Sequence, residues 1–450
     1  MSRRLVSWVA ARCLRWFYRA HRIMGRERVP ATGPVLLIGN HPNDLPDVIA
    51  GLSTTTRPVR YIATVSVTSS AAARRTYEAM GVIPVARVRD ARAMKARGVD
   101  MVAVNAAAAA LVVQALAGGD VVGVFPEGGV HDVPEIGRLR TGVADMVLRY
   151  LHADAKNDVH IVPFGLQYEA PRTPGSDVIV QVGEPFSLRA WLQSQPAGQT
   201  GAAALTARFR EALRAVTRNA ATWEEGTTRD ELVAARAAQL APCDPLAAAP
   251  ALVAHAQRVA AAAHADGPGP HAVRLRTVAH SLARAVERAG GIGTSALDHA
   301  RLLYALDLQR QPDPVPRGAP WTGLPAALIG GVMHAPAWWL VWHLAHRSAK
   351  ARADVVARSF VPGLYIMVAW YGLVTLAAAG ALMAWGRSPL WALFLLVTLP
   401  RFGDLAMGWR ARYRAYRLVA RVQGWSTPER QALCAAAAAL REAWEATPLD

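Results

Sequence analysis

The stretch VLLIGNHPNDLPD, residues 35–47, decides the fold prediction. It opens with an apolar run typical of a buried strand, and Gly, Asn and Pro residues then break the run before a helical segment. His41 follows the strand directly, and Asp47 lies six residues further on. A carboxylate that holds one imidazole nitrogen leaves the other as a general base, so the pair predicts proton transfer. The structural alternative is that His41 caps the loop while Asp47 occupies the first helical turn.

Further apolar runs of the β type follow along the chain. They are VRYIAT at 59–64, VIPVA at 82–86, VVGVF at 121–125, VHIVPFG at 159–165 and DVIVQV at 177–182. Helical segments at 99–116 and 142–152 alternate with these runs. The pattern predicts an α/β fold, with a mixed sheet flanked by helices on both faces and an active site at the strand ends.

Two more strand ends carry side chains suited to binding a polar substrate. Glu127 and Gly128 follow the run at 121–125, where glycine permits close approach of a ligand to the backbone. Arg87 follows the run at 82–86, and its bidentate guanidinium suits a phosphate. The structural alternatives are a tight turn closed by a local salt bridge at Glu127, and a solvated or paired arginine at Arg87.

The composition excludes a small or mostly disordered protein. The chain has 450 residues, 52% of them hydrophobic, and a formal net charge of +17. Its length allows two to four domains, and its positive charge predicts an anionic partner. No helix-turn-helix, zinc-finger or RNP-like pattern is present, and arginines cluster beside apolar segments. We therefore expect an anionic phospholipid bilayer as the partner and no nucleic acid.

Cysteine usage and the first residues favour a cytosol-facing membrane protein. Cys13, Cys243 and Cys434 are far apart and predict neither a disulfide framework nor a zinc site. Arginines interrupt the apolar residues of the start, which excludes a secretory signal peptide. On a helical wheel these arginines share one arc, so residues 1–28 are predicted to form an amphipathic interfacial helix. The alternative is a surface helix packed on its own domain.

The remaining chain divides by composition. A catalytic domain is expected at 29–220, and an Ala- and Arg-rich helical linker or insert at 221–317. Residues 318–346 lack Asp, Glu, Lys and Arg, as do 359–386, and each run exceeds the roughly 20 residues that span a bilayer. The predictions are a membrane segment at 318–346, a membrane hairpin at 359–405 and a basic helical tail at 406–450.

Charge patterning predicts the topology of these segments. The third apolar run, 388–400, is too short to cross alone and is expected to return part way across. Basic residues flank the hairpin on both sides, so both flanks are predicted to be cytoplasmic. With the catalytic domain also on the cytoplasmic side of the cell's inner membrane, the segment 318–346 must bend or re-enter. Pro325, Gly330-Gly331 and Pro336 are candidate places for a bend.

Together these stretches resemble the glycerophospholipid acyltransferase family. That family carries a His-x(4 or 5)-Asp pair, a G-x-x-[FIP]-[IV]-x-R block, an F-P-E-G block and a V-P block. The chain has all four in order: His41-x5-Asp47, GVIPVAR at 81–87, FPEG at 125–128 and Val162-Pro163. The resemblance covers about residues 30–190. Membrane-bound glycerol-3-phosphate/dihydroxyacetone-phosphate acyltransferases are the more similar subgroup, although Val130 replaces a Ser and Arg140 a Lys of that subgroup's pattern.

The resemblance implies a specific chemistry. His41 would deprotonate an alcohol, Asp47 would orient His41, and the alkoxide would attack an acyl thioester in a ternary complex. Arg87, helped by Arg140, would hold the acceptor phosphate, while Glu127 and Gly128 would shape the glycerol site. The donor would be acyl-CoA or acyl-carrier protein, with no metal and no cofactor. Glycerol 3-phosphate is the expected acceptor, with lysophosphatidate or another lysophospholipid as the alternative.

Two hypotheses from other classes stay open. A metal-dependent phosphoesterase could use carboxylates and imidazoles at strand ends. Its ligands would come from His41, Asp44, Asp47, His131 and Asp132. A non-catalytic membrane anchor or scaffold is the other alternative. The phosphoesterase would depend on a divalent metal, whereas an acyltransferase would keep its activity in the presence of a chelator.

Overall fold

A computed structural model describes most of the chain. The described residues are 14, 17–18, 20–65, 75, 78, 81–87, 91–96, 98–130, 133–153, 158–168, 176–196, 198–237, 250–265, 269–288, 300, 323–348 and 354–446. They fall into two compact units. The first contains His21–Gln167 and Val178–Arg218, and the second contains Tyr168–Asp177 and the chain from Asn219 onward.

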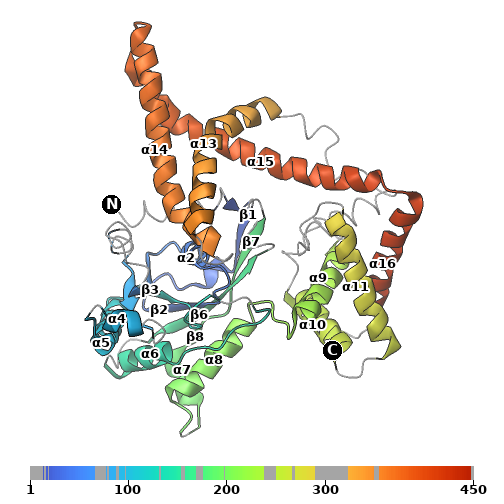
Figure 1. Cartoon of the computed structure of the whole chain (residues 1–450). Helices are drawn as coiled ribbons and strands as arrows, with labels where there is room; N and C mark the ends of the chain where they lie inside the picture. Colours follow the sequence, from blue (N-terminus) through green and yellow to red (C-terminus); the bar gives the residue numbers. More distant parts are fainter. Residues whose placement is uncertain are drawn as a thin grey trace. The chain divides into compact units, whose positions relative to one another are not determined.

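The first unit is built on a mixed sheet (Figure 1). Its described strands are β1 (Ala20–Met24), β2 (Val35–Gly39), β3 (Val59–Thr64), β4 (Ile83–Val85), β5 (Val121–Val124), β6 (His160–Tyr168), β7 (Asp177–Val182) and β8 (Phe186–Ser187). Their order is β1-β7-β6-β2-β5-β3-β4, with β8 paired to β6. The pairs β2–β5, β2–β6, β3–β5 and β3–β4 are parallel, whereas β6–β8 is antiparallel. The predicted fold class is confirmed.

The strand register places two loops side by side. Strand β2 lies between β5 and β6, with Ile38 opposite Val124. Because the two strands are parallel, their carboxyl ends meet at one edge of the sheet. His41 lies three residues beyond Ile38, and Glu127 lies three residues beyond Val124. The register therefore brings these two candidate residues to the same edge.

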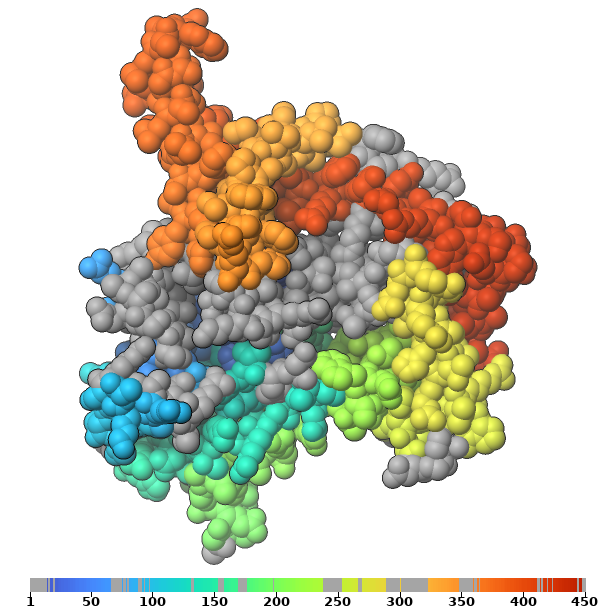
Figure 2. Space-filling view, viewed as in Figure 1, coloured from blue at the N-terminus to red at the C-terminus, as the bar shows by residue number. Residues whose placement is uncertain are grey.

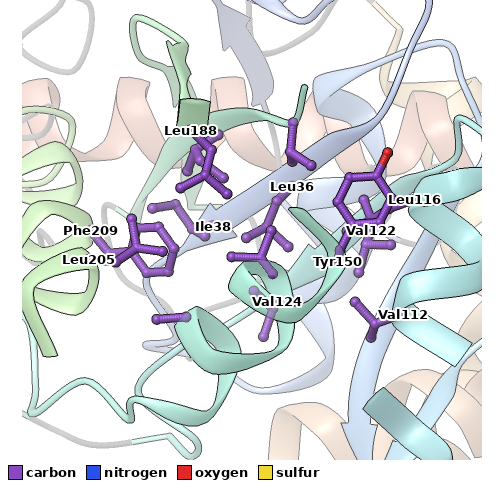
Figure 3. Packing of buried hydrophobic residues seen from close by; sticks show 14 of the residues in the cluster. Leu36, Ile38, Val112, Leu116, Val122, Val124, Tyr150, Leu188, Leu205 and Phe209 are labelled. Carbon is purple, nitrogen blue, oxygen red and sulfur yellow. The ribbon is translucent and has the colours of Figure 1, made fainter. Parts of the chain in front are cut away.

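Helices cover one face of the sheet through a large apolar core. They include α5 (Met101–Ala117), α6 (Gly142–Ala153), α7 (Leu188–Ser194) and α8 (Ala202–Arg214). Leu36 and Ile38 of β2 pack in this cluster with Leu116 of α5, Tyr150 of α6 and Phe209 of α8, all of them buried (Figure 3). Alternate residues of β2 point to this face, and burial on both sides explains why its sequence is continuously apolar.

The opposite face holds the short helix α2 (Leu45–Gly51), followed by the 3-10 turn η2 (Leu52–Thr54). Glycines make room for aromatic rings here. A Cβ on Gly39 would lie 2.3 Å from the Phe164 ring, and one on Gly51 would lie 2.0 Å from the Tyr61 hydroxyl. A Cβ on Gly123 would lie 2.6 Å from the Tyr61 ring. These glycines let α2 and the rings pack tightly under the carboxyl ends of β2 and β5.

The predicted amphipathic helix at 1–28 does not extend through its last residues. Ala20–Met24 forms strand β1, which lies next to β7 at the edge of the sheet, and Arg26–Arg28 forms a 3-10 turn. The Arg28 guanidinium donates to the Val182 carbonyl of β7 at 2.9 Å. Pairing with an available sheet edge thus overrides the helical pattern at this point. Residues 1–13 lie outside the described part of the chain.

The second unit contains a helical bundle. Its helices α9 (Trp223–Ala237), α10 (Pro250–His264) and α11 (Pro270–Arg288) precede the apolar helices in the sequence, whereas α16 (Thr427–Glu445) follows them. One cluster of buried residues joins all four helices and the end of α15 (Phe394–Gln423). It contains Leu232, Val259, Leu282, Leu418, Val422 and Leu440. Segments about 150 residues apart in the sequence therefore share one core.

Three helices of this unit are long and apolar enough to cross a membrane: 324–347, 365–384 and 389–410. They belong to α13 (Leu324–Ser348), α14 (Asp354–Ala384), the 3-10 segment η7 (Pro389–Leu393) and α15. Figure 2 shows these helices in orange to red. Large apolar side chains are exposed along them, including Val332, Val368, Leu376, Trp385, Trp391 and Phe394. Helix α13 continues through Gly330 and Pro336, and the third apolar segment is longer than the run predicted at 388–400.

Polar and small residues hold these apolar helices together. His334 is 4% exposed, and its Nε2 lies 3.0 Å from the Tyr371 hydroxyl on α14. A Cβ on Gly330 of α13 would lie 2.1 Å from the Phe402 carbonyl oxygen on α15. Close backbone approach at glycine and hydrogen bonds between helices are typical contacts of membrane helices.

Candidate active site

His41 and Asp47 form a hydrogen-bonded pair beyond the end of β2. The distance from His41 Nδ1 to Asp47 Oδ2 is 2.8 Å, and the two side chains are 14% and 0% exposed. Because an ionised carboxylate only accepts hydrogen bonds, Nδ1–H donates to Asp47. The Nε2 of His41 is then left as a proton acceptor. The predicted pair is thus within hydrogen-bonding distance and partly accessible to solvent.

The position of Asp47 combines the two interpretations that the sequence left open. Asp47 lies in the first turn of α2, and its Oδ2 also accepts the backbone N–H of Asn43 at 2.6 Å. A carboxylate is favourable at this end of a helix, because the first N–H groups have no partner within the helix. The same atom accepts Nδ1–H of His41. The helix start therefore fixes the carboxylate that orients the imidazole.

Glu127 is 6% exposed and binds the backbone on two sides. Its Oε1 accepts the N–H of His41 at 2.8 Å, and its Oε2 accepts the N–H of Gly137 at 2.8 Å. The structure therefore places Glu127 beside His41, where its carboxylate holds the backbone of two loops. A direct contact of Glu127 with substrate remains a prediction.

Phe125 supports the imidazole from the same loop. Its ring lies 4.2 Å from the His41 ring, centroid to centroid, with an angle of 10° between the planes. Phe125 also lies nearly parallel to Tyr61 of β3, at 5.5 Å and 10°. Phe164 of β6 contacts Phe125 edge-on at 5.9 Å. The sequence argument used Phe125 only as part of a motif and did not identify Tyr61.

Gly128 and Arg140, which the resemblance assigned to the glycerol site and to the acceptor phosphate, lie next to each other. Gly128 has φ +71°, and a Cβ added to it would lie 3.3 Å from Cγ of Arg140. The Arg140 N–H donates to the Pro126 carbonyl at 2.7 Å, which ties the two loops together. Arg140 itself is exposed. An exposed guanidinium beside a glycine turn is suited to an anionic group of a substrate.

Arg87 follows β4, three strand positions away from β2 in the sheet. Three strand spacings amount to about 14 Å, so Arg87 is not in the immediate surroundings of His41. The backbone just before Arg87 is held by Asn105 of α5, whose side chain accepts from the Ala86 N–H at 2.8 Å and donates to its carbonyl at 3.1 Å. The assignment of Arg87 to a phosphate remains a prediction.

Sequence reasoning missed the asparagines that position these loops. Asn105 fixes the backbone before Arg87, and Asn40 ties the end of β2 to β6. The Asn40 side chain donates to the Leu166 carbonyl at 3.1 Å and accepts from the Leu166 N–H at 2.7 Å. An asparagine between a buried strand and a histidine is a local signal for Asn40. No local signal exists for Asn105, because its partner is 19 residues away.

The phosphoesterase hypothesis needs a cluster of metal ligands. Within the described part of the chain, no group of three His, Cys, Asp or Glu side chains is arranged to hold a metal ion. Two of the residues considered for that role, His131 and Asp132, lie outside the described residues. Asp47, a third, is directed at His41 and the Asn43 N–H.

The chain was compared with proteins of known sequence and structure. Its residues 21–167 match the family model described as Acyltransferase. Among curated proteins, it is 42% identical over 65 residues to glycerol-3-phosphate O-acyltransferase 2 of Saccharomyces cerevisiae, covering 14% of this chain and 9% of the relative. It is 36% identical over 77 residues to glycerol-3-phosphate O-acyltransferase 1 of the same yeast, covering 17% and 10%.

One solved structure is similar in part. The crystal structure of the 1-acyl-sn-glycerophosphate acyltransferase PlsC from Thermotoga maritima aligns with 14% sequence identity and a TM-score of 0.34. The alignment covers 47% of this chain and 76% of that chain. The family model spans β1 to β6, including His41, Asp47, Arg87, Glu127 and Gly128. Residues 21–167 of this chain therefore form a domain of the acyltransferase family.

Proposed function

We propose that the protein transfers a fatty acyl group from an acyl thioester to a hydroxyl of glycerol 3-phosphate, within phospholipid synthesis. The observation that carries the proposal is the His41–Asp47 pair, with 2.8 Å between Nδ1 and Oδ2 at the edge of an acyltransferase domain. Both yeast relatives are glycerol-3-phosphate O-acyltransferases by name, and this favours the small water-soluble acceptor. This chain spans about a tenth of their length.

The proposed reaction needs one base and no covalent enzyme intermediate. His41 Nε2 takes the proton of the acceptor hydroxyl as its oxygen attacks the thioester carbonyl. The carbonyl carbon becomes tetrahedral, and its C–S bond then breaks. The imidazolium, stabilised by Asp47, returns the proton to the departing thiolate. Products are the ester and the free thiol, and the reaction consumes no metal or cofactor.

The acceptor phosphate is proposed to bind at Arg87 and Arg140, with Gly128 leaving room for the glycerol part. Arg140 covers the Gly128 turn, and Arg87 is held at the end of β4. Arg87 follows the end of β4, and Arg140 lies in the segment between β5 and α6, on the side of the sheet where His41 lies. Arginine suits this task because its planar guanidinium donates two parallel hydrogen bonds to phosphate oxygens.

The membrane is the proposed place of reaction. Three helices have the length and composition of membrane spans, and an acylated product partitions into a bilayer. We place the acyltransferase domain on the cytoplasmic face of the cell membrane, where arginine-rich segments meet anionic headgroups.

Acyl transfer by isolated membranes tests the proposal. Wild type, His41→Ala, Asp47→Asn and the control His152→Ala, an exposed histidine of α6, are each given radiolabelled acyl-CoA or acyl-carrier protein. Glycerol 3-phosphate, dihydroxyacetone phosphate and lysophosphatidate are supplied separately, with and without chelator. We expect labelled lysophosphatidate from glycerol 3-phosphate, with a chelator-insensitive rate. The His41→Ala variant should lose about 10²- to 10⁴-fold, and His152→Ala should match wild type.

Each other outcome has a defined meaning. Acyl transfer to lysophosphatidate alone would support the acyltransferase assignment, with lysophosphatidate as the acceptor in place of glycerol 3-phosphate. Equal product from wild type and His41→Ala would remove His41 from the chemistry. An absence of acyl product, together with metal-dependent release of phosphate from the phosphorylated acceptor, would favour the phosphoesterase hypothesis.

A further inference from the structure

Three aromatic rings lie nearly parallel between β3 and the candidate base. The Tyr61 ring makes an angle of 10° with Phe125, and Phe125 makes an angle of 10° with the His41 imidazole. We call Tyr61, Phe125 and His41 the ring stack. The centroid distances along it are 5.5 and 4.2 Å, within the range of favourable aromatic contacts.

Tyr61 occupies a cavity shaped for it by glycines. The residue is 2% exposed. A Cβ on Gly123 would lie 2.6 Å from its ring, and a Cβ on Gly51 would lie 2.0 Å from its hydroxyl oxygen. Any larger residue at either position would displace the ring. Tyr61 is therefore held by β5 on one side and by the end of α2 on the other.

The hydroxyl of Tyr61 does not explain this arrangement. Among the described residues it has no hydrogen-bond partner, although it is buried. Burial raises the pKa of Tyr61, and the nearby Asp47 carboxylate raises it further. The phenol therefore stays neutral, and within the described part of the chain its hydroxyl makes no hydrogen bond to the pair. An unpaired buried hydroxyl is unfavourable, so the contribution of Tyr61 must come from its ring.

The His41 ring needs a second restraint besides Asp47. The torsion between Cβ and an imidazole has a broad minimum, and one hydrogen bond fixes Nδ1 without fixing the tilt of the ring around it. A flat neighbour removes this freedom. Phe125 supplies that neighbour, but it lies just beyond β5 and its own ring torsion is equally broad. Contacts with Tyr61 and the edge of Phe164 restrain the Phe125 ring in turn.

We propose that Tyr61 is a positioning residue of the acyl-transfer site, which acts through Phe125 to fix the plane of the His41 imidazole. This inference rests on the proposed function. It predicts that the ring of Tyr61 is needed for turnover, whereas its hydroxyl is not. It also predicts an effect on kcat rather than on acceptor binding, because Tyr61 is buried at the end of the ring stack away from His41.

The test compares two substitutions of Tyr61 with a matched control, in the full-length protein. Tyr61→Phe keeps the ring, and Tyr61→Leu removes it. Val59→Ala is the control, because Val59 lies two residues earlier on β3, is 5% exposed and is outside the ring stack. For each protein kcat, acceptor KM and the thermal unfolding midpoint are measured. The rate at which diethyl pyrocarbonate modifies His41 is followed by mass spectrometry of the peptide.

We expect Tyr61→Leu to lower kcat at least about tenfold with acceptor KM within twofold of wild type. It should also change the modification rate of His41. Tyr61→Phe should keep the wild-type kcat and the wild-type modification rate of His41. Val59→Ala should lower the unfolding midpoint as Tyr61→Leu does, yet keep kcat and the modification rate.

Several results would overturn the inference. One is a Tyr61→Leu variant with wild-type kcat, or with a kcat lowered only as much as in Val59→Ala. Another is a Tyr61→Phe variant whose kcat is as low as that of Tyr61→Leu. An unchanged modification rate of His41 in Tyr61→Leu would also overturn it. If wild type transfers no acyl group, the proposed function fails, and the modification rates still decide whether Tyr61 orders His41.

Discussion

Glu127 accepts the backbone N–H of His41, with 2.8 Å between nitrogen and Oε1. This bond joins the loop after β5 to the loop after β2, which are 86 residues apart in the sequence. The other carboxylate oxygen accepts the N–H of Gly137. Glu127, which belongs to the FPEG motif associated with substrate binding, thus also connects two loops and holds the backbone of His41 in place. We call this pair of hydrogen bonds the Glu127 bridge.

Replacing Glu127 with glutamine should disrupt this bridge despite the similar size. The amide has one acceptor oxygen, so its NH₂ group must face one of the two backbone N–H donors. We expect a loss of about 1–3 kcal/mol in the free energy of unfolding, with a lower kcat. Thermal unfolding in detergent and acyl-transfer kinetics measure the two effects. Glu135→Gln, at a carboxylate 46% exposed that pairs with Arg214, should change neither. A fully stable and active Glu127→Gln variant would contradict the bridging role.

Replacing Arg87 with lysine tests the phosphate assignment. Lysine keeps the charge but loses the paired donors, so acceptor KM should rise about tenfold while kcat changes little. The test is steady-state kinetics with glycerol 3-phosphate at fixed donor concentration. Arg92→Lys, on the exposed face of helix α4 (Ala91–Lys95), is the matched control and should leave KM unchanged. If the acceptor KM of Arg87→Lys equals that of wild type, the acceptor phosphate binds at residues other than Arg87.

Most strands were predictable from sequence because a buried strand such as β2 is a continuous run of apolar residues. The apolar runs at 35–39, 59–64 and 177–182 coincide with β2, β3 and β7, and the segment 142–152 differs from α6 by one residue. Strand β1 was missed, because AHRIM lies at the edge of the sheet next to β7 and its single arginine, Arg22, fits the helical pattern of the preceding arginines equally well. Edge strands carry weaker hydrophobic patterns than central ones.

The candidate site was predictable only as far as its residues act on near neighbours. His41 and Asp47 are six residues apart across one turn, so their spacing alone suggested a pair. The hydrogen bond from the His41 N–H to Glu127 depends on the strand register, which a single sequence does not reveal. The place of Tyr61 depends on Gly51 and Gly123, which lie on two other elements. Contacts between distant segments leave no periodic signal in a single sequence.

His264 of α10 should make the stability of the bundle depend on pH. Burial, as the largest cause, lowers the pKa of His264, and Arg276 and His280 lower it further, against opposing effects of Glu225 and Glu224. As pH falls, His264 therefore takes up its proton at about pH 6.5 in the unfolded chain and only at a lower pH in the folded chain. Because the unfolded state then binds more protons, the free energy of unfolding falls as pH drops through 6.5 toward the lowered value.

The His264→Gln variant should reduce this pH dependence. The difference between unfolding midpoints at pH 7.5 and 5.5 should shrink in the variant, as followed by circular dichroism in detergent. His271→Gln changes an exposed histidine of α11 and should keep the wild-type difference. The same difference in all three proteins would show that His264 is not responsible.

The shared core of the bundle makes a prediction about membrane topology. Helices α9 to α11 precede the apolar helices, α16 follows them, and Leu282 of α11 and Leu440 of α16 belong to one buried cluster. Both segments must therefore lie on the same side of a membrane. An even number of crossings follows, so the three apolar helices cannot each make one complete crossing. The basic flanks of the predicted hairpin indicate the same parity.

Labelling with a membrane-impermeant maleimide in sealed vesicles measures this parity. In a background with Cys13→Ser and Cys243→Ser, native Cys434 of α16 is exposed. Two further variants replace Cys434 with serine and carry either Ser281→Cys, on the exposed face of α11, or Ser388→Cys, between α14 and η7. We expect Cys434 and position 281 to react from the same side and position 388 from the opposite side. Reaction of Cys434 and position 281 from opposite sides would contradict a common core, because two segments separated by a bilayer cannot pack against each other.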